Sequence, residues 1–132
     1  MSNKILVVDD YCLHGELMEQ RFRTAGFEVC YAKDVEEALY LLRRENPEVV
    51  VMDLIMPGVG GVGLLKEIRT RPEWKDIPVV VVTADGHGNL IEEAYQLGIS
   101  RCLVKGNYRF GDLLRLVNRL LAEREKCSSA GE

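Results

Sequence analysis

Four short apolar runs along the chain each end on a polar residue that can take part in chemistry. The runs are Ile5–Val8, Val49–Met52, Val79–Val82 and Cys102–Val104, and the residues that follow them are Asp9 with Asp10, Asp53, Thr83 and Lys105. Strands buried on both faces of a parallel sheet have such continuous apolar runs. The carboxyl ends of parallel strands meet at one edge of the sheet, where α/β proteins bind ligands, so these polar side chains are expected to gather there.

Strand and helix signals alternate along the rest of the chain. They predict strands at 4–9, 27–32, 48–53, 78–83 and 101–104, and helices at 12–25, 34–44, 60–71, 88–97 and 109–125. Asp34 is the expected N-cap of the second helix with Glu37 as its capping-box partner, and Gly26 and Gly98 are expected to end helices. Five strand–helix units of this kind predict an α/β fold, a doubly wound parallel sheet with helices on both faces.

Length and composition limit the other possibilities. The 132 residues fit one domain, which we place at 1–126, with 127–132 as a flexible C-terminal tail or the start of a linker. The net charge of −4 argues against direct binding of nucleic acid, whose phosphates select basic faces. We expect no membrane span and no export signal, and the four cysteines fit no zinc or redox motif, so a cytoplasmic location with reduced thiols is expected.

The three carboxylates at the predicted sheet edge favour a bound cation. Asp9, Asp10 and Asp53 would raise one another's pKa at close range unless a cation lies among them, and Mg²⁺ is the expected ion because it prefers oxygen ligands. Aspartate is an established nucleophile in phosphoryl transfer. Lys105 would supply a positive charge to a phosphoryl group and Thr83 a hydroxyl donor.

Each of these residues has a plainer interpretation when it is taken alone. Asp9 and Asp10 could be turn residues and a helix cap, Thr83 a strand-end residue, and Lys105 a surface lysine. Asp53 could be a solvated loop carboxylate, but its place among the other strand ends disfavours that reading. His14 is interpreted as a surface residue of the first helix in preference to a phosphorelay histidine.

In combination the motifs are specific. Val-Val-Asp9-Asp10, Asp53-Leu-Ile-Met-Pro57-Gly58, Val-Val-Thr83-Ala84 and Leu-Val-Lys105 closely resemble the receiver domain of two-component response regulators, over about Lys4 to Lys126. The resemblance implies a flavodoxin-like, five-stranded sheet in the order 2-1-3-4-5. It also implies that Asp53 is the phosphoacceptor, with Thr83, Ala84 and Lys105 around the phosphate. The implied Mg²⁺ site comprises Asp10, Asp53 and the Ile55 carbonyl, with Asp9 acting mostly through water.

Two positions depart from the family pattern. Cys102 stands where the family usually has an aromatic residue that follows the switch, and Gly106 stands where it usually has proline. We therefore expect the signal to leave through Thr83, the loop 84–90 and the helix 88–97. Tyr95 on that helix would supply an aromatic contact to a partner, or would merely cover its own helix.

The resemblance implies a phosphoacceptor signalling domain with no catalysis beyond self-phosphorylation and self-dephosphorylation. Ile55 and Asp85 would flank the path of the attacking water. The implied partners are a sensor histidine kinase or phosphotransfer protein and a downstream output protein or domain, with the chain a monomer or weak homodimer. Two alternatives remain open: a phosphohydrolase with an aspartyl nucleophile, and a receiver-like interaction module that does not phosphorylate.

Overall fold

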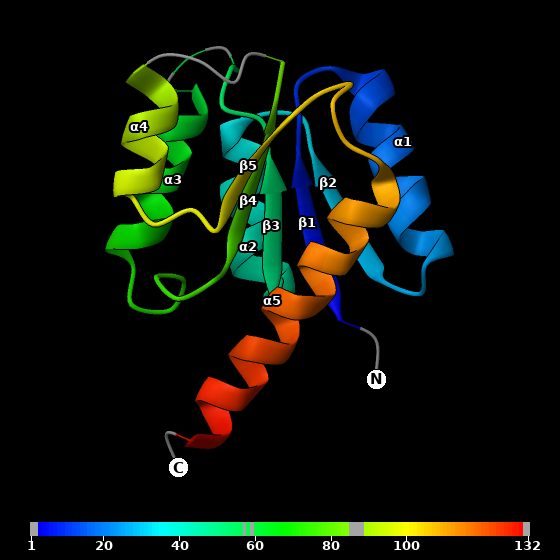
Figure 1. Ribbon diagram of the computed structural model, residues 1–132. Helices are drawn as coiled ribbons and strands as arrows, with labels where there is room; N and C mark the ends of the chain where they lie inside the picture. Colours follow the sequence, from blue (N-terminus) through cyan, green and yellow to red (C-terminus); the bar gives the residue numbers. More distant parts are fainter. Residues whose placement is uncertain (1–2, 57, 59, 85–88, 131–132) are drawn as a thin grey trace.

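The computed structural model describes residues 3–56, 58, 60–84 and 89–130 (Figure 1). Its strands are β1 (Lys4–Val8), β2 (Glu28–Ala32), β3 (Val49–Met52), β4 (Val79–Thr83) and β5 (Arg101–Val104). Its helices are α1 (Cys12–Thr24), α2 (Val35–Glu45), α3 (Gly60–Thr70), α4 (Asn89–Gln96) and α5 (Phe110–Ala130). The strands form one parallel sheet in the order β2-β1-β3-β4-β5, which confirms the predicted fold.

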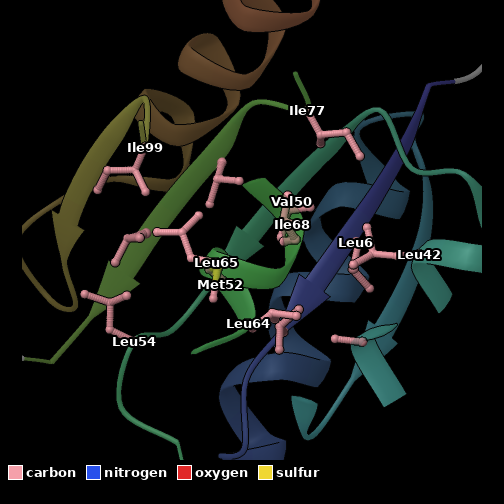
Figure 2. Close-up of a cluster of buried hydrophobic side chains, with 14 of the residues drawn as sticks. Leu6, Leu42, Val50, Met52, Leu54, Leu64, Leu65, Ile68, Ile77 and Ile99 are labelled. Carbon is pink, nitrogen blue, oxygen red and sulfur yellow. The ribbon is translucent and has the colours of Figure 1, made fainter. Parts of the chain in front are cut away.

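The continuous apolar runs are explained by burial on both faces of the sheet. On one face, Leu6 and Val50 pack with Leu42 of α2 and with Leu65 and Ile68 of α3, in a cluster that also includes residues of α4 (Figure 2). On the other face, α1 and α5 cover a second cluster. That cluster includes Ile5, Val7, Phe22, Leu113 and Val117. Successive strand residues therefore enter different clusters and are equally buried.

Local signals that end and begin helices are confirmed. Asp34 Oδ1 accepts a hydrogen bond from the Glu37 N–H at 2.8 Å, and the Glu37 carboxylate in turn accepts one from the Lys33 N–H. Gly26 and Gly98 follow α1 and α4 with φ of 99° and 83°, in the left-handed region that glycine adopts readily.

The last helix is longer than the sequence predicted. α5 was expected to end at 125, but its backbone continues to Ala130 and extends beyond the lower end of the sheet (Figure 1). No proline or glycine interrupts the chain between Gly111 and Gly131, so nothing in the sequence stops the helix earlier. The stretch 127–130, which we expected to be part of a flexible tail, is thus helical. Within the described ranges, no helix is long and apolar enough to cross a membrane.

Arg69 joins the lower ends of α3 and α4. Its guanidinium donates to the carbonyls of Leu97 and Gly98, at the end of α4, and to those of Lys75 and Ile77, which precede β4. Burial lowers the pKa of Arg69, and Asp76 opposes that effect. These bonds anchor the end of α4 that lies away from the carboxyl edge of the sheet.

Gly61 allows α3 to lie directly against the chain that leaves β3. A Cβ atom at this position would lie 2.5 Å from the Asp53 carbonyl oxygen and 2.5 Å from Leu54 Cα. These are backbone atoms and cannot rotate away as a side chain could. The Gly61 N–H also donates to the Leu54 carbonyl at 2.9 Å. The glycine therefore sets how closely the helix supports the segment that contains Asp53.

We expect Gly61→Ala to lower the free energy of unfolding by about 1–3 kcal/mol, because the added methyl group must displace backbone. Gly111→Ala is the matched control, since a Cβ there meets no atom within 4 Å. It should leave stability unchanged or raise it by up to about 1 kcal/mol through helix propensity. Urea denaturation of both variants measures the difference. Equal stability of the two would contradict this account of Gly61.

Candidate functional site

The acidic residues that follow β1 and β3 meet at the carboxyl edge of the sheet. Val8 is paired with Met52, so Asp9 and Asp53 leave the sheet side by side, and the Asp53 N–H donates to the Val8 carbonyl at 3.0 Å. Oxygens of Asp9, Asp10 and Asp53 lie within 4.8 Å of one another. Asp9 and Asp53 are 3% and 6% exposed, whereas Asp10 is exposed. The structure therefore brings these three predicted residues together.

Lys105 reaches the same cluster from the end of β5. Its Nζ lies 3.0 Å from Asp53 Oδ2 and 3.3 Å from Asp9 Oδ2. Burial lowers the pKa of Lys105, but Asp53 and then Asp9 raise it by more, so its net pKa is raised. The ammonium group stays charged and partly neutralises the two buried carboxylates.

Asp53 is held by two donors. Its Oδ1 accepts a hydrogen bond from the Ile55 N–H at 3.1 Å, and its Oδ2 accepts one from Lys105. The Ile55 side chain points away from the core and is 53% exposed. Asp53 is thus a buried carboxylate in a fixed orientation, beside an apolar side chain that remains open to solvent.

Thr83 contributes a buried hydroxyl at the end of β4. The residue is 1% exposed, and its Oγ1 makes no hydrogen bond to any residue that the structure describes. A buried polar group left unpaired costs about 1–3 kcal/mol. The Lys105 N–H donates to the Thr83 carbonyl at 2.8 Å, which ties the two strand ends together. Ala84 follows and is exposed, while Asp85 lies outside the described residues.

Asp9 is enclosed by donors, and one of them is His14. The Tyr11 N–H donates to Asp9 Oδ1 at 2.9 Å, and His14 Nδ1 lies 2.5 Å from Asp9 Oδ2. Burial raises the pKa of Asp9, but the bonds from His14 and Tyr11, together with Lys105, outweigh burial and lower it. Asp9 is therefore ionised at neutral pH.

The interpretation of His14 as a surface residue is wrong. Its side chain is only 21% exposed and faces the acidic cluster. His14 lies in the first turn of α1, and helical side chains tilt back toward the N-terminus of their helix, which here is the end nearest Asp9. That tilt, combined with a position five residues after Asp9, is the signal that could have identified it.

Tyr31 was also missed by sequence reasoning. Its hydroxyl, at the end of β2, donates to the backbone carbonyl of Asp9 at 2.7 Å. The ring fits beneath α1 because residue 15 is glycine: a Cβ at Gly15 would lie 2.3 Å from the Tyr31 ring. Burial, and then Cys12, raises the pKa of the Tyr31 hydroxyl, so it remains a donor. Both the carboxylate and the carbonyl of Asp9 are thereby fixed.

The two residues that depart from the family pattern lie near the site but not within the carboxylate cluster. Cys102 is half-buried on β5, and burial raises the pKa of its thiol. Tyr95 of α4 is 50% exposed, and its hydroxyl accepts a hydrogen bond from the Cys102 N–H at 3.2 Å. Gly106 has a φ of 86°. Tyr95 thus connects α4 to the outer edge of β5.

The chain is similar in sequence to a response regulator and a probable transcriptional regulator, and in structure to a chemotaxis protein. It is 36% identical to the response regulator PleD of Caulobacter vibrioides, over 80% of the chain but 23% of that protein. It is 41% identical to the probable transcriptional regulator ycf27 of Porphyridium aerugineum, over 63% of the chain and 33% of that protein. The chain therefore spans a third or less of these relatives. Chemotaxis protein CheY4 of Vibrio cholerae superposes with a TM-score of 0.83 at 27% identity, over 91% of this chain and 99% of that one.

The chain also matches the sequence pattern of one family over most of its length. The sequence pattern of the family described as "Response regulator receiver domain" matches residues 5–118, a range that contains β2 to β5, all of β1 except Lys4, and the first part of α5. This range includes the acidic cluster of Asp9, Asp10 and Asp53, together with Lys105. The chain therefore belongs to the response regulator receiver domain family.

Proposed function

We propose that this chain is the phosphoacceptor domain of a two-component system and that Asp53 receives the phosphoryl group. The observation that carries the proposal is the surroundings of Asp53: Lys105 Nζ lies at 3.0 Å, and a nearby strand end carries the buried hydroxyl of Thr83, which has no hydrogen-bond partner among the described residues. A phosphoryl group on Asp53 would offer oxygens to both donors.

In the proposed step, the phosphoryl donor is a phosphohistidine on a sensor histidine kinase or phosphotransfer protein. An Asp53 carboxylate oxygen attacks phosphorus and forms a P–O bond. The P–N bond to the imidazole breaks, and its electron pair stays on the nitrogen, which takes up a proton. The Lys105 ammonium group, which contacts the Asp53 carboxylate, then forms an ion pair with the phosphoryl oxygens. The Thr83 hydroxyl donates a hydrogen bond to them.

The residues present fit a Mg²⁺ ion, which the family implies. Carboxylates of Asp9, Asp10 and Asp53 lie within 4.8 Å of one another, and the exposed Asp10 keeps the cluster open to water. We infer that Asp10, Asp53 and the Ile55 carbonyl would hold the ion, with Asp9 acting through water. When bound, the ion would neutralise charge that develops during phosphoryl transfer.

The output is proposed to leave through α4. Phosphorylation adds roughly −1.5 to −2 charge near neutral pH. This charge would draw in Thr83 and the segment 84–90 and would move the nearby end of α4. The hydrogen bond between Tyr95 and the Cys102 N–H would pass that movement to β5. The receiver of the signal would be an output protein or domain, and the chain would act as a monomer or weak homodimer in the cytoplasm, without direct contact to nucleic acid.

Asp53→Asn should abolish phosphate uptake from a small acyl phosphate in the presence of Mg²⁺, because the amide cannot act as the nucleophile. Asp34→Asn is a suitable control: it lies after another strand of the same sheet, and asparagine caps a helix as well as aspartate does. Intact-mass spectrometry reports uptake directly. Equal uptake by the wild type and Asp53→Asn would refute the assignment. Mg²⁺ binding with no uptake by the wild type would favour an interaction module.

Mg²⁺ should stabilise the fold by RT ln(1+[L]/Kd), which is about 1.4 kcal/mol at ten times Kd. Asp10→Ala should remove most of this gain, since it deletes a proposed ligand. In a chelator the same variant should be at least as stable as the wild type, because repulsion within the cluster is relieved. Thermal melts across a Mg²⁺ series test both points. If the melting temperature of the wild type did not change with Mg²⁺ concentration, the proposed metal site would be contradicted.

The proposed route can be tested at one hydrogen bond. Phosphorylation should shift the amide NMR resonance of Cys102 in the wild type and in Cys102→Ser, which keeps the backbone N–H. Tyr95→Phe should take up phosphate normally but show a much smaller shift, because it lacks the acceptor oxygen. If Cys102→Ser abolished the response while Asp53 still took phosphate, the Cys102 side chain would be the switch and the route would be wrong.

A further inference from the structure

His14 is the nearest side chain to Asp9 among the donors that surround it. Its Nδ1 lies 2.5 Å from Asp9 Oδ2, and His14, Asp9 and Asp53 line the same small cavity. An ionised carboxylate only accepts hydrogen bonds, so Nδ1 is the protonated nitrogen of this contact. His14 thus joins α1 directly to the acidic cluster.

The contact is not that of two ligands on one ion. With Mg²⁺–ligand distances of about 2.1 Å in octahedral geometry, adjacent ligand atoms are about 3 Å apart. The Nδ1 and Oδ2 atoms are closer than that, at 2.5 Å. His14 is therefore a donor to a carboxylate of the site, and not an additional ligand beside it.

A second donor, Lys105, also lies close to Asp9 Oδ2. Lys105 Nζ lies 3.3 Å from this oxygen, slightly farther than its 3.0 Å distance from Asp53 Oδ2. If His14 did not bond to Oδ2, the ammonium group would be the main donor left to it. The carboxylate would then turn toward Lys105, and Lys105 would be shared more evenly between Asp9 and Asp53.

We propose that His14 is a positioning residue of the acidic site. It orients the Asp9 carboxylate toward the proposed Mg²⁺ ion, so that Lys105 stays paired with Asp53. This inference rests on the proposed function, because it assigns His14 a role at the proposed Mg²⁺ and phosphoryl site. Hydrogen-bond partners of metal-binding carboxylates commonly orient them in this way.

His14→Leu and His14→Asn separate the hydrogen bond from the space that the ring fills. Leucine removes the donor, whereas the asparagine amide can present an N–H near the position of Nδ1. We expect His14→Leu to weaken Mg²⁺ binding about tenfold or more, as is typical when such partners are lost. His14→Asn should recover most of the affinity. Glu16→Gln, at an exposed position of the same helix, should bind Mg²⁺ as the wild type does.

Isothermal titration with Mg²⁺ gives the affinities, and chemical denaturation in a chelator gives the stability of each variant without metal. The supporting result is that His14→Asn recovers Mg²⁺ affinity while the metal-free stabilities of the two variants are equal. If His14 only filled space, the affinity would not depend on whether the side chain has an N–H donor. Equal Mg²⁺ affinity of His14→Leu and the wild type would overturn the inference, as would tighter binding by His14→Leu or an asparagine variant as weak as the leucine one. If the wild type itself bound no Mg²⁺, the proposed metal site would fail and this inference with it. Normal wild-type binding with no effect of His14 would refute this inference alone.

Discussion

The ion pair between Lys105 and Asp53 joins the ends of two strands that are not neighbours. Strand β4 lies between β3 and β5, so the 3.0 Å contact depends on the register of all three strands. Met52 at the end of β3 is paired with Val81, and β4 and β5 continue two residues farther, to the pair Thr83 and Val104. A slip of one residue in any of these strands would turn its side chains to the other face, so the site depends on the register of the whole sheet.

Because burial controls this register, the sequence predicts much of the site. Strands covered on both faces must be apolar throughout, and the first polar residue after each run marks where the strand leaves the core. That reasoning places Asp9, Asp53, Thr83 and Lys105 at one edge, as the structure has them. Their roles in phosphate and metal binding remain predictions, since the geometry only shows that they are close.

The parts that sequence reasoning missed depend on contacts between elements that no periodic pattern records. The orientation of His14 follows from the tilt of a helical side chain toward a strand end, and the role of Tyr31 depends on the pairing of β1 with β2. Gly61 lies in the predicted helix 60–71, where glycine is disfavoured, and its close approach to the Asp53 backbone accounts for it. Tyr95 accepts a hydrogen bond from β5 through its hydroxyl, a contact that could not be assigned from the residue type alone.

Gly15 and Tyr31 also restrict how this sequence can change. The ring occupies the volume that any side chain at position 15 would need, and its hydroxyl holds the carbonyl of Asp9. A larger residue at position 15 is therefore compatible with the fold only together with a smaller residue at position 31. That pair of changes would remove the hydroxyl and release the carbonyl of Asp9. The sizes of the two residues are therefore matched. A single substitution at either position should destabilise the fold more than a substitution at an exposed position of α1 does.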